Sequence, residues 1–311
     1  MSSPTTSSSS DPPTELEQLM SRGSMIKRFK ELEAQAILES SLDQDLPGDP
    51  SQSTKETTDE QGYLLYDSFL SNQLYFDDLK HVNYPGISYT YPKNLYNNNE
   101  EITLNISQDK SLGKGGILWD AAFILSEYVL EKKLCATDST IIELGAGCGL
   151  VGVLLNKLGE IRCRPQKREF FFKHQSNEET RAGLNCLTTD LQSHLPLMMS
   201  NFKQNNLPTE NAQVMEWGVH DNSHLTKYDF VIGADIVASL YNPELLAETI
   251  YRIVKETGRG YISFKGREEQ YHVRFEKRMK ELFSFWEVDT AAGSRNKNSG
   301  VGIICFSGKI K

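Results

Sequence analysis

Several features that define other classes of protein are missing from this sequence of 311 residues. No run approaches the ~18 consecutive apolar residues of a membrane span. The Ser/Thr/Pro-rich start is followed by no apolar stretch, so no secretory signal is expected. The five cysteines are scattered and form no CxxC pair, which argues for a reducing compartment and against disulfides or a zinc site. The phosphate-binding pattern GxxxxGK[ST] is absent as well. We therefore expect a soluble protein of the cytoplasm, with the nucleus as the other candidate compartment, and no metal.

Negative charge is concentrated at one end of the chain. The formal net charge is −9, and residues 1–60 hold 12 acidic and five basic side chains, a net −7, which leaves −2 for the other 251 residues. That larger part is nearly neutral and has no basic surplus for a nucleic-acid backbone. We expect no nucleic-acid partner and no membrane partner. We expect the protein to be a monomer.

Composition divides the chain into three parts. Residues 1–60 are polar and acidic, and are predicted to be disordered or loosely helical, with helical apolar spacing over residues 14–42. Residues 61–112 are rich in tyrosine and end in EITLNIS, whose alternation predicts a half-buried strand in a cover on the main domain. Residues 113–311 alternate predicted strands and helices, which is typical of a mostly parallel sheet with helices on its faces.

The last part predicts an α/β fold with a Rossmann-like, seven-stranded sheet. No long helix separates the last two strands, which indicates a closing antiparallel hairpin. The predicted strands are Thr140–Leu144, Cys186–Thr189, Ala212–Glu216, Asp229–Gly233, Gly260–Phe264, Phe285–Asp289 and Val301–Phe306. The predicted helices are Leu118–Lys133, Leu150–Leu158, Leu191–Asn205, Pro243–Lys255 and Glu268–Phe283.

The strongest motif is IIELGAGCGLVG at residues 141–152. A buried strand ends around Glu143, and three glycines turn the chain into a helix whose N-terminal N–H groups favour an anionic group. The dinucleotide pattern GxGxxG would need glycine at position 150, where Leu150 stands. The pattern ExGxGxG is instead similar to the S-adenosylmethionine site of Rossmann-like methyltransferases. S-adenosylmethionine is therefore the expected cofactor.

A cofactor ribose needs an acid at the tip of the second strand, about 20 residues further on. The candidate is Asp190, but it lies 45 residues after Gly145. The excess falls on residues 161–184, which have six basic and three acidic side chains and no regular period. We interpret this segment as an inserted surface loop or a translated intron. Asp190 has an alternative role as a helix N-cap before Leu191.

A wider resemblance follows from the segments around this motif. GKGGILWDAAFILSEYVLE at residues 113–131, with ELGAGCGLVG, TTDLQSHLPLM, VMEWG and GADIV, resembles the small seven-β-strand, non-SET protein lysine methyltransferases. That group includes enzymes acting on Hsp70 chaperones, on the valosin-containing AAA ATPase and on translation elongation factors. The resemblance covers about residues 100–308. It implies methyl transfer from S-adenosylmethionine to a lysine of a protein substrate.

The same resemblance implies roles for individual residues. Asp235 would meet the methyl group and the substrate. The last position of the family's Asp-x-x-Tyr pattern is Ala238 here, and the nearby Tyr241 either substitutes for the missing tyrosine from a displaced turn or only packs before the next helix. Cofactor-binding roles fall on Trp119, Glu143, Gly145, Gly147, Asp190, Leu191, Trp217 and Ala234.

Two other functions stay open from the sequence. The tyrosine-rich segment could close the site over a small molecule or another kind of amine. The missing tyrosine and the inserted segment would also fit a non-catalytic domain that binds the cofactor or a partner. Lys265 and Arg267, after the fifth strand, could touch a substrate or partner, or begin a solvated helix.

Overall fold

The computed structural model describes part of the chain, in ten ranges: 58–60, 63–65, 80–91, 101–133, 139–163, 185–218, 226–239, 241–266, 269–289 and 300–310. All of these residues belong to one compact unit, 49–311. The helix predicted within residues 14–42 lies outside the described residues, as do residues 164–184 and Arg267.

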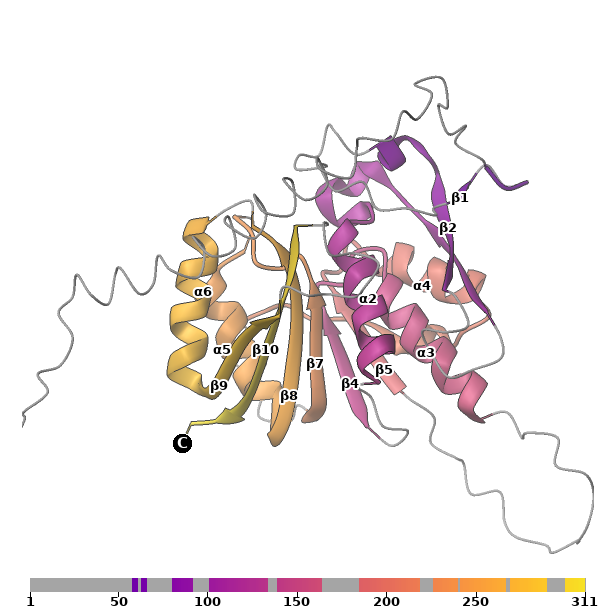
Figure 1. Ribbon diagram of the computed structural model, residues 1–311. Coiled ribbons are helices and arrows are strands. Elements are labelled where there is room, and N and C mark those ends of the chain that lie inside the picture. Colours follow the sequence, from indigo (N-terminus) through magenta and orange to yellow (C-terminus); the bar gives the residue numbers. More distant parts are fainter. Residues whose placement is uncertain are drawn as a thin grey trace, which may run out of the picture. The chain divides into compact units, whose positions relative to one another are not determined.

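A seven-stranded sheet organises the unit (Figure 1). Its strand order is β6-β5-β4-β7-β8-β10-β9. Four neighbouring pairs are parallel, and β10 is antiparallel to both β8 and β9. The predicted Rossmann-like sheet with its closing antiparallel hairpin is thus confirmed. The strands are β4 Thr140–Leu144, β5 Asn185–Asp190, β6 Ala212–Val214, β7 Tyr228–Ala234, β8 Val254–Lys265, β9 Phe283–Asp289 and β10 Val301–Lys309.

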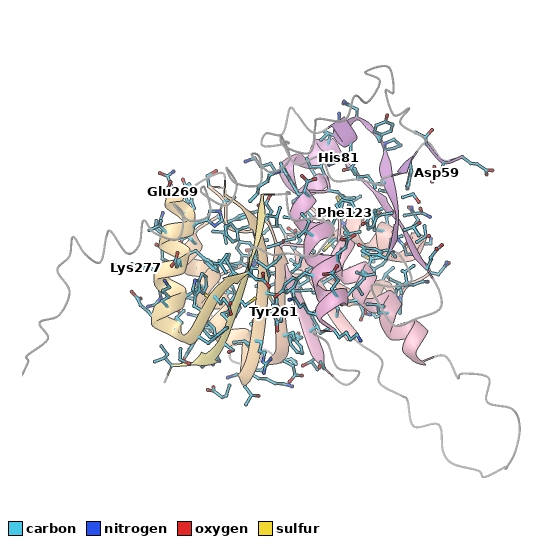
Figure 2. The ribbon with its side chains drawn as sticks, in the orientation of Figure 1. Asp59, His81, Phe123, Tyr261, Glu269 and Lys277 are labelled. Carbon is cyan, nitrogen blue, oxygen red and sulfur yellow. The ribbon has the colours of Figure 1, made fainter. Side chains whose placement is uncertain are left out.

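Helices cover both faces of this sheet, because successive side chains of a strand point to opposite faces. Ile141 belongs to one hydrophobic core and its neighbour Ile142 to the other. The first core includes Phe123 and Tyr261, both labelled in Figure 2. It is covered by α2 Asp120–Lys132, α3 Leu150–Cys163 and α4 Leu195–Gln204. The second is covered by α5 Pro243–Ile253 and α6 Glu269–Leu282. In the described part of the chain, no helix is long and apolar enough to cross a membrane.

A small three-stranded sheet precedes the large one. Its order is β1-β2-β3, with β1 Leu64–Leu65, β2 Gly86–Tyr91 and β3 Ile102–Ser107. The predicted strand over EITLNIS is confirmed, and its burial alternates as expected. Strand β2 is not predicted, although residues 87–91 alternate apolar and polar side chains; in the structure Ser88 is buried as well, and only Thr90 is exposed. Short 3-10 helices lie at Lys80–Asn83, Lys110–Gly116 and Thr209–Asn211.

Two asparagines at the end of α4, Asn201 within the helix and Asn205 at its C-cap, hold the small sheet to the domain. Asn201 accepts a hydrogen bond from the backbone N–H of Ser107 at 2.8 Å and donates to its carbonyl at 3.1 Å. Asn205 does the same at Asn105, at 3.1 and 2.7 Å. The two amides thereby pair with the edge of β3 as a neighbouring strand would. Asn201 also donates to the carbonyl of Cys148, which links the cover to the glycine turn.

Three element boundaries differ from the predicted ones by four or more residues. Helix α4 begins at Leu195 because residues 191–194 form a turn rather than its first helical turn. Strand β8 begins at Val254, where a helix was expected to continue, because this stretch pairs with β7 through an irregular register. Helix α3 runs to Cys163, so the first residues of the segment 161–184 are helical.

Candidate active site

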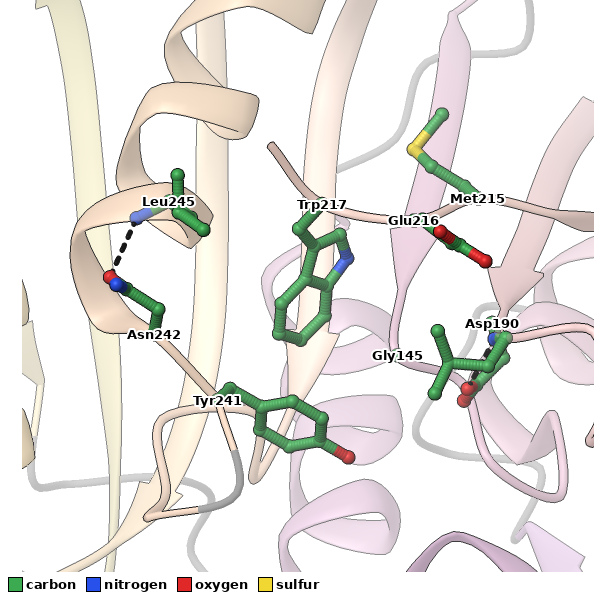
Figure 3. A pocket seen from close by; sticks show the side chains of 9 residues that line it. Gly145, Asp190, Met215, Glu216, Trp217, Tyr241, Asn242 and Leu245 are labelled. Atoms are coloured by element: carbon green, nitrogen blue, oxygen red, sulfur yellow. Dashed lines mark hydrogen bonds between the residues drawn. The ribbon is translucent and has the colours of Figure 1, made fainter. Parts of the chain in front are cut away.

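A pocket of about 290 Å³ opens where β4, β5 and β6 end. Ligands of open parallel sheets bind at this carboxyl edge. The pocket is lined by Gly145, Asp190, Leu191, Met215, Glu216, Trp217, Tyr241, Asn242 and Leu245 (Figure 3). The structure therefore brings together four residues predicted to bind the cofactor and the predicted Tyr241.

The turn after β4 requires glycine for two separate reasons. Gly145 and Gly147 have φ values of 60° and 55°, in the left-handed region that glycine adopts readily. A Cβ at Gly145 would lie 2.7 Å from Cγ2 of Ile236, and one at Gly147 would lie 2.7 Å from the carbonyl oxygen of Gly115. A side chain at either position would strain the backbone and would also clash with its neighbours.

Asp190 connects this turn to the pocket. Its Oδ2 accepts a hydrogen bond from the N–H of Gly147, and its Oδ1 accepts one from the N–H of Leu191, both at 2.6 Å. A carboxylate has about four acceptor positions, so capacity remains for the hydroxyl groups of a ligand. The alternative role as a helix N-cap is wrong, because α4 begins at Leu195 and His194 takes the cap position.

Aromatic and aliphatic side chains form the opposite wall. The rings of Trp217 and Tyr241 lie 4.8 Å apart and are tilted by 55°. In Figure 3, the indole stands between Leu245 and Asn242 on one side and Asp190 on the other. Leu191 and Leu245 remain 42% and 40% exposed, which leaves apolar surface for a ligand to cover.

Tyr241 reaches the pocket through a turn. Its N–H donates to the carbonyl of Ala238 at 3.1 Å, while Ile236 and Val237 are buried in the core. Burial raises the pKa of Tyr241 to about 12, and the negative charges of Asp190 and Asp235 act in the same direction. The phenol therefore stays protonated near neutral pH and can donate a hydrogen bond.

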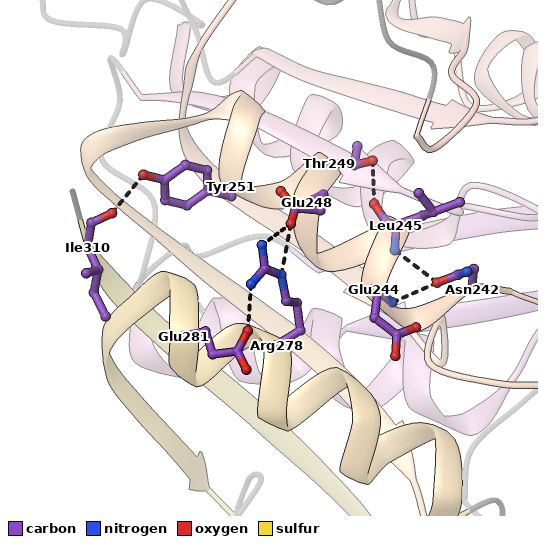
Figure 4. Close-up of polar contacts among 9 residues, drawn as sticks. All are labelled: Asn242, Glu244, Leu245, Glu248, Thr249, Tyr251, Arg278, Glu281 and Ile310. Carbon is purple, nitrogen blue, oxygen red and sulfur yellow. Dashed lines mark hydrogen bonds and ion pairs between the residues drawn. The ribbon is translucent and has the colours of Figure 1, made fainter.

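The start of α5 is fixed in place beside these rings. Asn242 caps the helix, with its side-chain oxygen accepting from the N–H groups of Glu244 and Leu245 (Figure 4). Arg278 of α6 pairs with Glu248 of α5 and with Glu281 of its own helix. These contacts hold the helix that supplies one pocket wall.

Glu143 lies behind the glycine turn and not among the residues lining the pocket. It is buried, and its Oε2 accepts a hydrogen bond from the N–H of Gly152 at 2.8 Å. Burial raises the pKa of Glu143 to about 8; the Gly152 hydrogen bond lowers it, and the charge of Asp190 raises it further. Its role toward a cofactor stays a prediction, and its contact in this structure is with α3.

The raised pKa makes a testable prediction about stability. Between the ordinary glutamate value and about pH 8, folded Glu143 keeps a proton that the unfolded chain has lost. The stabilisation from this retained proton is therefore complete below the ordinary pKa of glutamate. It decreases as the pH rises above that value and is lost once the pH has passed through about 8. Relative to Glu143→Gln, the free energy of unfolding of the wild type should fall from pH 6 to 8, by at most about 1.4 kcal/mol per unit. Urea unfolding at several pH values measures this, and parallel profiles for the two proteins would refute it.

The remaining predicted residues lie outside the lining of this pocket. Ala234 ends β7, and Asp235 follows it with a φ of 56°. Trp119 precedes α2, donates its indole N–H to the carbonyl of Lys114 at 2.8 Å and packs beside Ile117. Their roles toward methyl group, methionine and substrate stay predictions.

Lys265 is not a surface residue. The prediction that its side chain contacts a partner or solvent is therefore wrong. It is 2% exposed, and its Nζ lies 3.5 Å from Oδ2 of Asp120. A lysine that follows a strand and precedes a charged stretch looks solvated in sequence, and only the packing of α2 over it buries it.

Sequence reasoning missed four residues that line the pocket: Met215, Glu216, Asn242 and Leu245. A signal existed for one of them. Asn242 stands before a proline and a glutamate, which is the pattern of a helix N-cap followed by proline at the first helical position. Glu216 adds a second carboxylate to the pocket, which the sequence offered only as part of VMEWG.

These residues fit the expected cofactor. The nine residues that line the pocket include two carboxylates and no lysine or arginine, which suits hydroxyl groups and a positive charge better than a phosphate. The aromatic wall suits a planar base. The glycine turn has no side chains to cover its backbone, and it lies beside Asp190, which accepts a hydrogen bond from the N–H of Gly147.

A seven-stranded Rossmann-like sheet, with a glycine turn bonded to an acid at the tip of the next strand, defines the class of S-adenosylmethionine-dependent methyltransferases. Residues 98–282, more than half of the chain, match the family described as "Lysine methyltransferase", and the chain belongs to that family.

Two relatives show how far the similarity extends. "EEF1A lysine methyltransferase 3" of Xenopus tropicalis is 29% identical over 175 residues, which are 56% of this chain and 68% of the relative. "Protein N-lysine methyltransferase METTL21A" of the same organism is 30% identical over 138 residues, 43% of this chain and 53% of the relative. The chain thus aligns with about two thirds of the first relative and about half of the second.

Among solved structures, a TehB-like S-adenosylmethionine-dependent methyltransferase from Corynebacterium glutamicum has a TM-score of 0.39 and 18% identity, covering 64% of this chain and 93% of that one.

Proposed function

We propose that the protein methylates the side-chain amine of a lysine in another protein. The observation that carries the proposal is the bridge from Asp190 to Gly147, beside a pocket walled by Trp217 and Tyr241. This arrangement supports binding of the cofactor at the sheet edge next to Asp235. The relatives, both named as lysine methyltransferases, support the choice of acceptor.

When bound, S-adenosylmethionine supplies an electrophilic methyl group, so the protein's main task is alignment. The acceptor lysine has an ordinary pKa of about 10.4 and must lose a proton before it attacks. A partly desolvated, aromatic surrounding disfavours its charged form. Asp235 orients the amine, and the protonated phenol of Tyr241 donates a hydrogen bond at the same site. The pKa of Tyr241 near 12 makes it a poor base at neutral pH, so we assign no dedicated general base.

The substrate belongs, in this proposal, to the translation factors, chaperones or AAA ATPases of the cytoplasm. The name of one relative, an EEF1A lysine methyltransferase, favours a translation factor as the first candidate. We further propose that the protein acts as a monomer.

Labelled methyl transfer tests the proposal. The purified protein and labelled S-adenosylmethionine are added to a cell lysate, and separately to EEF1A produced in bacteria. We expect a labelled protein band whose modified residue is a lysine by mass spectrometry. Cofactor binding in calorimetry without any labelled product would favour a non-catalytic domain. Label that appears only in small molecules would favour the small-molecule alternative.

A further inference from the structure

A buried ion pair lies beside the site and has no assigned role. Nζ of Lys265 lies 3.5 Å from Oδ2 of Asp120, and both side chains are 2% exposed. Removing two charges from water is costly, and a buried pair of this kind is often no more stabilising than apolar side chains of the same size. Its position in the fold is therefore more informative than its contribution to stability.

The pair joins α2 to β8, the strand whose end contacts Asp235. Lys265 is the last residue of β8, and Asp120 is the first residue of α2. The backbone N–H of Lys265 donates to Oδ1 of Asp235 at 3.3 Å. The end of β8 therefore contacts the predicted acceptor carboxylate with its backbone and the start of α2 with its side chain.

Ser263 makes a second connection of the same kind. Its carbonyl accepts a hydrogen bond from the N–H of Asp235 at 2.8 Å. Its hydroxyl, fully buried, donates to the carbonyl of Ala121 at 2.7 Å. Ser263 and Lys265 are two residues apart on one strand, so their side chains share the face that α2 covers.

Asp235 needs such support because of its backbone. Its φ of 56° lies in the left-handed region, which is costly for residues other than glycine, although least so for asparagine and aspartate. Strain of this kind is concentrated at functional sites. Two hydrogen bonds tie Asp235 to the end of β8, one to the carbonyl of Ser263 and one from the N–H of Lys265.

We propose that the junction of β8 with α2, made by the Asp120–Lys265 pair and the Ser263–Ala121 hydrogen bond, is a positioning device: it fixes the end of β8 against the start of α2 and thereby sets the direction of the Asp235 carboxylate. Neither residue of the pair touches the cofactor pocket. The inference rests on the proposed function, because it concerns the alignment of the acceptor lysine. A purely structural pair would affect folding and leave the turnover of folded protein unchanged.

The test removes both charges while keeping the side-chain volumes, in the double variant Asp120→Asn/Lys265→Met. The matched control is Asp229→Asn/Lys255→Met, which removes an ion pair of the same residue types, 2.8 Å long, at the opposite ends of β7 and β8. Both proteins are measured for melting temperature, for the dissociation constant of S-adenosylmethionine, and for kcat and KM with the acceptor protein identified by the labelling assay.

We expect kcat of the Asp120/Lys265 variant to fall about tenfold, while its cofactor affinity and the acceptor KM change less than about threefold, because alignment alone is lost. The control should keep the wild-type kcat. Equal kcat values in folded Asp120/Lys265 variant and wild type overturn the inference and leave the proposed function intact. If the wild type labels no protein, the proposed function fails and the inference with it.

Should the double variant not fold, Ser263→Ala decides the question. It removes only the hydroxyl that bonds Ala121 and loosens the same junction. A several-fold lower kcat at unchanged cofactor affinity supports the positioning role, and an unchanged kcat overturns it.

Discussion

Asp190→Asn is expected to weaken the binding of S-adenosylmethionine by about 10- to 100-fold. The carboxylate accepts from the N–H groups of Gly147 and Leu191 at once. Asparagine has one oxygen and one NH₂ group, so one of these two donors would face another donor. A lost hydrogen bond to a charged group costs about 1.5–3 kcal/mol, and 1.4 kcal/mol is tenfold in affinity. The turn would also lose its tie to β5, so a ligand would have to order it on binding.

Isothermal calorimetry on purified protein measures this effect, with the melting temperature as a check on folding. The matched control is Glu216→Gln, which neutralises the other carboxylate of the same pocket. Glu216 is exposed, so its charge is screened by water and its loss should matter less. Equal losses in both variants would mean that only the pocket's charge counts, and an unchanged affinity in Asp190→Asn would remove Asp190 from the site.

The glycine turn and its sheet could be predicted because their signals are local. Leu150 in place of a glycine already separates this turn from the dinucleotide type, and Ile141 and Ile142 are apolar because each faces a core. Asp190 was identified despite an unusual spacing, since the added residues leave the strand that carries it, Asn185–Asp190, in place between β4 and β6.

Other parts of the site depend on contacts between distant segments. Lys265 reads as a solvated residue until α2 packs over it and Asp120 meets it. Tyr241 lies three residues after the position of the tyrosine in the family pattern, yet the turn from Ala238 brings its ring against Trp217. The motif predicts Glu143 in the cofactor loop, whereas its carboxylate accepts a hydrogen bond from the N–H of Gly152 in the following helix. No local sequence pattern predicts contacts of this kind.

Asp235→Asn is expected to reduce methyl transfer at least about a hundredfold and to leave cofactor binding within about twofold. Asparagine tolerates the left-handed backbone and keeps an oxygen that can accept from the N–H of Lys265. The substitution therefore removes the negative charge and little else. Without this charge the acceptor amine loses its orienting partner, while the pocket formed by Asp190, Trp217 and Tyr241 keeps its shape.

Single-turnover transfer into the labelled acceptor protein measures the chemical step, and calorimetry measures the cofactor separately. Asp229→Asn is the matched control, because it makes the same change on β7 at the end away from the site. Asp235→Ala adds a second step: alanine also loses the contact with Lys265 and is strained at positive φ, so it should melt at a lower temperature than Asp235→Asn. If transfer by Asp235→Asn matches that of the control, the carboxylate does not orient the amine. The catalytic assignment would then pass to the phenol of Tyr241, and Tyr241→Phe would show the larger loss.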